Sequence, residues 1–150
     1  MRKAGVISTI LFTLLFVTIA QAQNYTMGVG ARFSSRAPLV NTSISFKYFF
    51  NEKTAAEALF CVNNPFALGL LVERHKPILT KQFSFFYGGG AYAGFSGPRR
   101  AGLHGIAGLD YKVPMIPFNL SIDWKPELTL ANEFSFEPAA LAVTARFTIR

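Results

Sequence analysis

Residues 118–125 read Phe118-Asn119-Leu120-Ser121-Ile122-Asp123-Trp124-Lys125, a strict alternation of large apolar and polar side chains. A period of two is the period of a β-strand, whose successive side chains point to opposite faces. Residues 141–149 repeat the pattern, with Leu, Val, Ala, Phe and Ile at alternate positions. Both stretches therefore predict strands with one uniformly apolar face.

The same alternation recurs along the chain between turn-forming residues, and it predicts eight strands. We expect them at 24–34, 42–50, 54–63, 66–74, 83–95, 102–113, 117–128 and 139–150. Sixteen Phe and twelve Gly favour strands and turns over long helices. Because 51% of residues are hydrophobic and only 15% are charged, a disordered chain and a coiled coil are excluded. A length of 150 residues then predicts one all-β domain.

Residues 1–22 have the pattern of a secretory signal peptide. Arg2-Lys3 form a basic start, an apolar core follows, and Ala20-Gln21-Ala22 supplies small residues at Ala20 and Ala22 for cleavage. The core is shorter than the roughly 20 residues of a membrane-spanning helix. We therefore expect an exported domain at 23–150. It retains 13 of the 15 basic residues against 8 acidic ones, without a basic run that would indicate nucleic-acid binding.

The face opposite the apolar one combines charge with very small residues. Its charged and histidine members are Arg32, Lys47, Glu57, Glu73, His104, Asp110, Lys112, Asp123, Lys125, Glu127 and Arg146. Glycines on the same face are Gly28, Gly30, Gly69, Gly88, Gly90, Gly94 and Gly108. Glycine weakens an exposed strand but makes room inside a narrow closed barrel. We therefore expect the apolar faces to contact lipid, in an eight-stranded antiparallel up-and-down transmembrane β-barrel without free sheet edges.

Aromatic residues near the strand ends predict two interfacial girdles. An exported chain with eight strands begins and ends in the periplasm, so odd strands run outward and even strands return. Aromatic rings favour the interface because they are partly apolar and partly polar. The expected girdle residues are Tyr25, Phe33, Tyr48, Phe95, Tyr111, Phe118, Trp124 and Phe147.

The interior of an eight-stranded barrel is just wide enough for its own side chains. We therefore expect the inward charges to form an ion-pair network that fills it. The expected members are Arg32, Glu73, Asp123, Lys125 and Arg146. A path for weak passage of small solutes is the alternative interpretation of the same residues.

Several segments together resemble a known family. They are Phe86-Tyr87-Gly88-Gly89-Gly90-Ala91, Gly108-Leu109-Asp110-Tyr111-Lys112-Val113, Ile116-Pro117 and Asp123-Trp124-Lys125-Pro126. With them, residues 24–150 resemble the small eight-stranded outer-membrane barrels of Gram-negative bacteria, of the OmpA/OmpX type and porin-like. The resemblance implies the cell outer membrane, contact with outer-membrane lipid and lipopolysaccharide, and insertion by the barrel assembly machinery. The chain departs from the family in ending on Arg150 instead of an aromatic residue, and in its short expected outer loops.

No metal site is expected, because one Cys and two separated His give no recognisable ligand spacing. No catalytic or cofactor site is expected either, because one His without a placed partner does not make a catalytic arrangement. The leading hypothesis is a non-enzymatic envelope protein. A lipid-modifying acyltransferase or deacylase is the alternative, with His104 as base and with Ser96 and Glu137 in other outer loops. A soluble lipocalin-like barrel, with its apolar face inward around a lipid, is the third interpretation.

Overall fold

The computed structural model describes residues 25–36, 41–62, 66–96 and 100–150. Within these ranges the chain forms one antiparallel sheet of ten strands. They are β1 (Met27–Ser34), β2 (Ser43–Asn51), β3 (Thr54–Cys61), β4 (Ala67–Ile78), β5 (Thr80–Gly94), β6 (Ala101–Lys112), β7 (Phe118–Trp124), β8 (Glu127–Thr129), β9 (Ser135–Glu137) and β10 (Leu141–Ile149). The expected signal peptide, with Ala20 and Ala22, lies outside the described residues.

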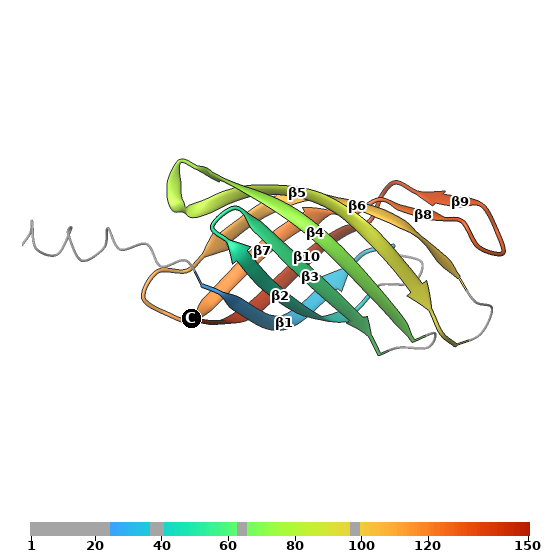
Figure 1. The fold of residues 1–150 in the computed structure, drawn as a ribbon, viewed down its shortest axis with the longest axis horizontal. Helices are drawn as coiled ribbons and strands as arrows, with labels where there is room; N and C mark the ends of the chain where they lie inside the picture. The colour runs from blue at the N-terminus through green and yellow to red at the C-terminus, as the bar shows by residue number, and fades with distance from the viewer. Residues whose placement is uncertain (1–24, 37–40, 63–65, 97–99) are drawn as a thin grey trace, which may run out of the picture.

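The sheet closes on itself. Each strand from β1 to β7 pairs with the next, β10 pairs with both β7 and β1, and the β5–β6 pairing completes the ring. Apart from the β8–β9 hairpin, the described strands form an eight-stranded wall whose strands cross the long axis obliquely (Figure 1). The predicted all-β, closed eight-stranded antiparallel barrel is confirmed.

The two ends of the barrel differ. One end, here called the terminal end, carries the C-terminus, the β2–β3 turn and the turn that joins β4 to β5 (Figure 1). The other end, the loop end, carries the β8–β9 hairpin. Strands β4 and β5 extend past the expected bounds to a tight turn at Leu79, which has φ 60°. In this extension Lys76 pairs with Phe85 and Pro77 pairs with Ser84.

The expected strand at 117–128 is divided into β7 and β8. Strand β7 pairs with both β6 and β10, and β8 continues the pairing with β6 alone. Pro126 stands at the break, where a residue without an N–H cannot continue a ladder on both sides. The short β9 then folds back onto β8 before the chain returns to the wall as β10.

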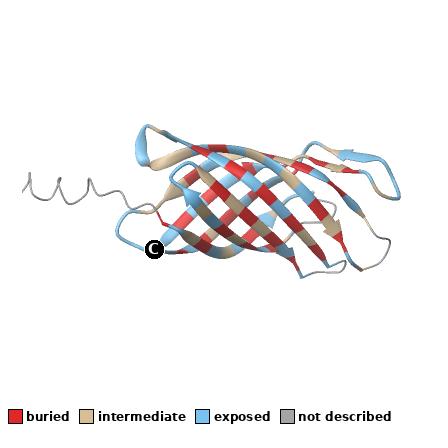
Figure 2. Ribbon diagram, viewed as in Figure 1, coloured by how far each residue is buried: buried red, intermediate tan, exposed pale blue. Residues whose placement is uncertain are grey.

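Burial alternates residue by residue along the wall (Figure 2). Large apolar side chains on the outward positions are exposed, among them Phe33 at 60% and Val72 at 59%. Charged side chains on the inward positions are buried, including Arg32 and Lys47 at 0%. The core of the fold is therefore the barrel interior, which combines buried charges with a smaller apolar cluster. Within the described ranges, no helix is long and apolar enough to cross a membrane.

Phe86 shows why the interior needs glycine. It lies directly opposite Gly108 on the neighbouring strand and is completely buried. A Cβ atom at Gly108 would come within 2.8 Å of Cζ of the Phe86 ring. The missing side chain lets the ring lie across β6 and fill the barrel, since an aromatic residue can cover a glycine on the adjacent strand.

Candidate functional site: the filled interior

Arg146 is the centre of the interior network. From β10 its guanidinium reaches Glu57 on β3, with Nη2 2.5 Å from Oε1. Nε donates to Ser45 Oγ at 2.7 Å, and Nη1 donates to Ser121 Oγ at 2.9 Å and to Asn119 Oδ1 at 3.2 Å. The side chain thus joins strands on both sides of β10 and is fully buried.

Lys47 connects this centre to β4. Its Nζ lies 2.7 Å from Glu73 Oε2 and 3.7 Å from Glu57 Oε2. The same ammonium group stands 4.6 Å from the centre of the Phe86 ring, at cation–π distance. Lys47 and Glu57 lie directly opposite each other on β2 and β3, so the strand register brings their charges together.

Two further ion pairs lie inside the wall. Arg32 pairs with Asp123, and Lys125 pairs with Glu127. All five expected network members, Arg32, Glu73, Asp123, Lys125 and Arg146, are therefore buried and paired inside the barrel.

The sequence interpretation left out part of the network. Lys47, Glu57, Asp110 and Glu127 belong to it as well, so the described interior holds four cationic and five carboxylate side chains. Their alternation placed them on the inward face, but their pairing depends on strand register and tilt. Near-equal numbers of opposite charges are what a buried network requires, because an unpaired charge is costly away from water.

Aromatic rings close the interior toward the terminal end. Tyr25 meets Phe49 edge to face at 5.1 Å, Phe49 contacts His75 at 4.8 Å, and His75 stacks on Phe86 at 5.2 Å. This corrects the expectation for Tyr25, which is buried in the stack and does not belong to the outer girdle. The reason is that β1 begins only at Met27, and a bend at Thr26 turns the ring over the mouth of the barrel.

The other expected girdle residues lie on the outside. Phe33, Tyr48, Phe95, Phe118, Trp124 and Phe147 are exposed, and Tyr111 is half-buried. Several meet a second ring on a neighbouring strand, as in Phe118–Phe147 at 6.1 Å and Phe83–Tyr111 at 4.9 Å. These pairs lie toward the terminal end, whereas Phe66–Phe95, at 5.9 Å, lies toward the loop end.

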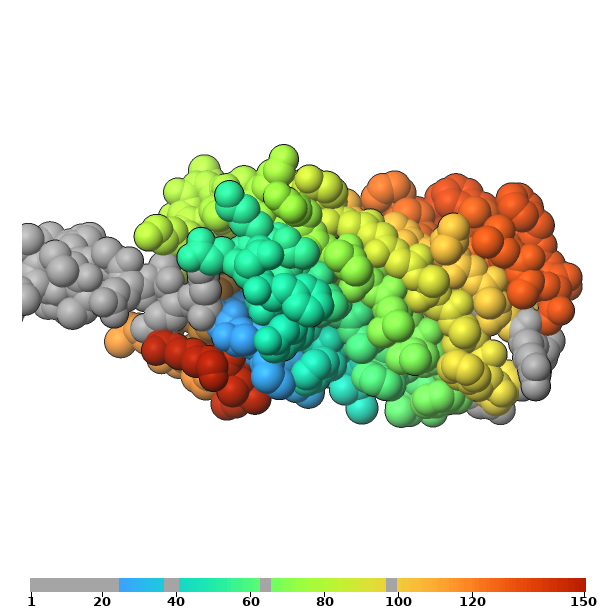
Figure 3. Space-filling model, viewed as in Figure 1, coloured from blue at the N-terminus to red at the C-terminus, as the bar shows by residue number. Residues whose placement is uncertain are grey.

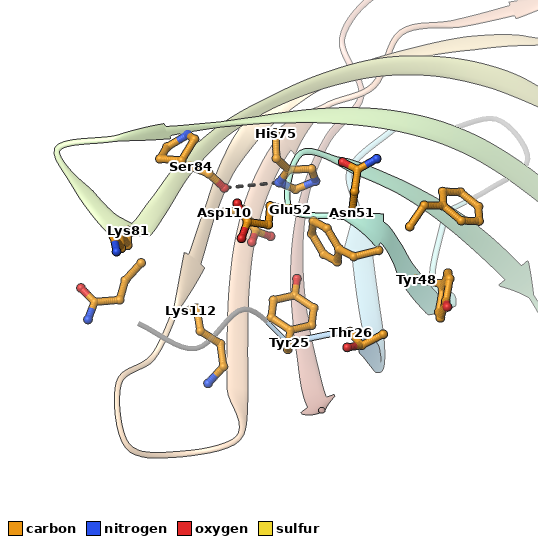
Figure 4. A pocket seen from close by; sticks show the side chains of 14 residues that line it. Tyr25, Thr26, Tyr48, Asn51, Glu52, His75, Lys81, Ser84, Asp110 and Lys112 are labelled. Atoms are coloured by element: carbon orange, nitrogen blue, oxygen red, sulfur yellow. Dashed lines mark hydrogen bonds between the residues drawn. The ribbon is translucent and has the colours of Figure 1, made fainter. Parts of the chain in front are cut away.

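A vestibule of about 430 Å³ opens at the terminal end, above the aromatic stack (Figure 4). Tyr25, Phe49 and His75 line its inner part, with Ser84 and Asp110 beside them. His75 Nδ1 lies 3.3 Å from Ser84 Oγ, and His75 Nε2 lies 3.0 Å from Glu73 Oε2. A hydroxyl, an imidazole and a carboxylate are therefore connected in series at the cavity wall, an arrangement that the sequence interpretation missed.

Toward the loop end the interior is divided by polarity. Strands β3 to β6 contribute an apolar cluster of Leu59, Cys61, Ala67, Leu71 and Ile106, next to Phe86 and Tyr92. The strands across the barrel contribute Arg32, Asp123 and their neighbours. Cys61 is a free thiol and is 1% exposed. The strand patterns do not predict this apolar half. Its members alternate in step with Glu57, Glu73 and Asp110, so the pattern places apolar and charged residues on the same inward face without separating them.

His104 lies among these residues. Its Nε2 is 3.1 Å from the Leu70 carbonyl oxygen, and its ring is 5.5 Å from that of Tyr92. Its Nδ1 is buried without a hydrogen-bond partner among the described residues. The other two residues considered with it have different contacts: Ser96 Oγ accepts from the Phe66 amide, and Glu137 accepts from the Ala139 amide.

Among the described residues, no group of three or more His, Cys, Asp or Glu side chains is arranged to hold a metal ion. Comparison of the chain with protein-family models, with curated proteins and with solved structures found no match.

Proposed function

We propose that this protein is an integral outer-membrane β-barrel with a structural role in the cell envelope. The observation that carries the proposal is the inverted burial of its side chains. Arg32, Lys47 and Lys125 are 0% exposed, whereas Leu70 is 56% and Ile122 is 53% exposed. A continuous apolar outer wall is costly in water and matches the hydrocarbon core of a bilayer.

The closed wall supports the same proposal. A bilayer core offers no water to satisfy backbone groups, so a sheet can cross it only without free edges. The β5–β6 pairing removes those edges here. The exported N-terminal pattern and the resemblance to small outer-membrane barrels then favour the outer membrane as the location. Lipopolysaccharide, outer-membrane lipid and the assembly machinery are the partners that this location implies.

A structural role is favoured over solute passage by what fills the lumen. Ion pairs occupy the middle of the barrel, and the stack of Tyr25, Phe49, His75 and Phe86 covers it toward the terminal end. The lipocalin-like alternative requires an apolar interior and a charged outer surface. Charged side chains buried in the lumen and large apolar side chains exposed on the wall favour the membrane barrel over that alternative.

Fractionation of cells and gel mobility test the proposal. We expect the protein in the outer-membrane fraction and a faster, compact band when the sample is not boiled in detergent. Planar-bilayer recording of the purified barrel should show no conductance steps above background. Aqueous solubility without a mobility shift would reject the membrane proposal, and steady conductance would replace the structural role with solute passage.

A second function, ester hydrolysis at the terminal vestibule, is favoured by the series of Ser84, His75 and Glu73. A nucleophile, a base and an orienting carboxylate within hydrogen-bond reach are the requirement for acyl transfer, and distances are often longer without substrate. Ser84 Oγ would attack the ester carbonyl and pass its proton to His75, which protonates the departing alcohol. Water would then release the acyl group. This geometry favours His75 over His104 as the base of any lipid-modifying activity.

A serine-reactive fluorophosphonate separates this second function from a structural hydrogen bond. Hydrolysis requires labelling of the folded barrel, loss of labelling in Ser84→Ala, and strong reduction in His75→Gln. Ser96→Ala serves as the matched control, because Ser96 accepts from a backbone amide and does not line the vestibule. If the folded wild-type barrel is not labelled, the hydrolase proposal is rejected and the structural role is unaffected.

A further inference from the structure

The outer wall has an apolar groove of about 420 Å³ across β2, β3 and β4, bordered by Gly90 and Ala91 of β5. Ala56 and Ala58 on β3 form its floor. Tyr48 and Phe46 on β2 lie directly opposite these alanines on one side, and Val72 and Leu70 on β4 lie opposite them on the other. The strands from β2 to β5 face the viewer in Figure 3.

The dimensions of the groove suit one hydrocarbon chain. Its two ridges belong to strands separated by two strand spacings, about 10 Å between backbones. Ala56 and Ala58 are half-buried although they point outward, because the neighbouring large side chains rise on both sides of them. A lipid-facing wall gains van der Waals contact when an acyl chain fills such a depression.

The groove ends in positive charge at the terminal end. After Leu70 and Val72, the next outward positions of β4 are Arg74 and Lys76, and both are exposed. At about 6.8 Å per two residues, they stand roughly 7 and 14 Å beyond Val72. Arg74 lies opposite Thr54 on β3 and Tyr87 on β5, and Lys76 Nζ lies 5.5 Å from the centre of the Tyr87 ring.

The surroundings of these two cations are also basic. Lys53, which precedes Thr54 in the β2–β3 turn, is exposed, whereas Lys81, just after the β4–β5 turn, lines the terminal vestibule. Among the described residues of those two turns, Glu52 is the one acidic residue, and it lies next to Lys53 in the chain. Glu73, the neighbour of Arg74 in the chain, is buried in the barrel and pairs with Lys47.

We propose that this surface binds one phospholipid with an anionic headgroup, taken from the leaflet at the terminal end of the barrel. One acyl chain lies over Ala56 and Ala58, and the phosphate contacts Arg74 and Lys76 at the level of the Tyr87 ring. The proposal rests on the proposed membrane location. It follows from the continuity of an apolar groove with a cationic end. The groove matches the acyl chain of a phospholipid, and the cations match its anionic headgroup.

Native mass spectrometry of the folded barrel in detergent tests the site. The probes are phosphatidylglycerol and phosphatidylcholine with identical acyl chains. We expect one phosphatidylglycerol retained in preference to phosphatidylcholine. Arg74→Gln combined with Lys76→Gln should weaken phosphatidylglycerol binding about 25-fold, since each cation near anionic lipid contributes about fivefold. Ala58→Phe should reduce binding of both lipids, because it fills the groove.

Matched controls lie on the opposite side of the barrel, on or just after β10. Arg150→Gln removes an exposed cation at the same end, and Ala145→Phe enlarges an outward alanine. Both should bind phosphatidylglycerol like the wild type. All variants change outward positions, and their heat-dependent gel mobility reports whether they fold.

Equal retention of the two lipids, or an unchanged affinity in Ala58→Phe, would overturn the lipid site. A dimer that disappears in Ala58→Phe would assign the groove to a second copy of the chain and overturn it as well. Each of these three results leaves the proposed membrane barrel standing if the protein still fractionates with membranes. A barrel that remains in the aqueous fraction would instead reject the proposed function, and the lipid site with it.

Discussion

Arg146 on β10 and Glu57 on β3 form an ion pair of 2.5 Å across two intervening strands, β1 and β2. The Arg146 side chain crosses β1 beside Gly28, where a Cβ atom would come within 3.3 Å of its Cδ. Gly28 on β1 therefore lets the charged side chain from β10 pass over β1 and reach its partner on β3. The pair ties the end of the chain to its third strand.

Breaking this pair should be strongly destabilising. Arg146→Met leaves Glu57 buried, with Lys47 at 3.7 Å as its remaining cation. We expect a loss of about 3 kcal/mol in the free energy of unfolding, since removal of one partner leaves an uncompensated buried charge. Urea unfolding of the barrel in lipid vesicles, followed by Trp124 fluorescence, measures it.

The double variant Arg146→Met, Glu57→Leu supplies the control for that experiment. Its destabilisation should be smaller than the sum of the two single variants by at least about 1 kcal/mol, because contacting residues are not additive. Simple additivity would mean that the two side chains do not interact, and it would contradict the network described above.

Gly108 should not tolerate even a methyl group. In Gly108→Ala the added Cβ meets the Phe86 ring and the backbone of Ile122. We expect about 1–3 kcal/mol of destabilisation from overpacking. Gly105→Ala, on the same strand, is the matched control, because its Cβ would have its nearest neighbour at 3.6 Å. Equal effects at both positions would show that the loss is general to glycine in β6.

A charge on the outer wall distinguishes lipid from water around the barrel. Ile122→Lys places an ammonium group on a position that is 53% exposed. In a bilayer we expect a loss of about 2–4 kcal/mol in the free energy of unfolding if the position lies near the midplane. Leu79→Lys, at the tip of the β4–β5 turn and 97% exposed, should change stability little. A neutral Ile122→Lys would place that wall in water.

The thiol of Cys61 reports whether the interior is accessible. It is 1% exposed within the apolar half of the lumen. We expect a water-soluble maleimide to leave the folded barrel unlabelled and to label it fully after unfolding.

Phe134→Cys in a Cys61→Ser background is the control for that measurement, since Phe134 is 79% exposed near the β8–β9 turn. It should react in the folded state. Labelling of folded wild-type protein at the rate of this variant would mean that the loop end of the lumen is open to solutes, against a filled interior.

Much of the barrel could be predicted from local pattern alone. Alternation such as that of residues 118–125 determines which side chains share a face, because the pleat of a strand repeats every two residues. It placed Arg32, Asp123 and Arg146 on one side and Phe33, Trp124 and Phe147 on the other, and the structure has them so. It failed at Tyr25, where the chain bends before β1 begins.

The pairing of the interior charges was decided only by the tertiary structure. Arg146 finds Glu57 because closure and strand tilt bring β10 and β3 within reach of one side chain, and no local pattern encodes that distance. The series of Ser84, His75 and Glu73 likewise depends on register between β4 and β5. Sequence by itself determined the eight strands of the wall, apart from their ends, and which face of each strand is polar and which is apolar. The closed sheet determined which residues meet, because contacts inside a barrel connect strands that are distant along the chain.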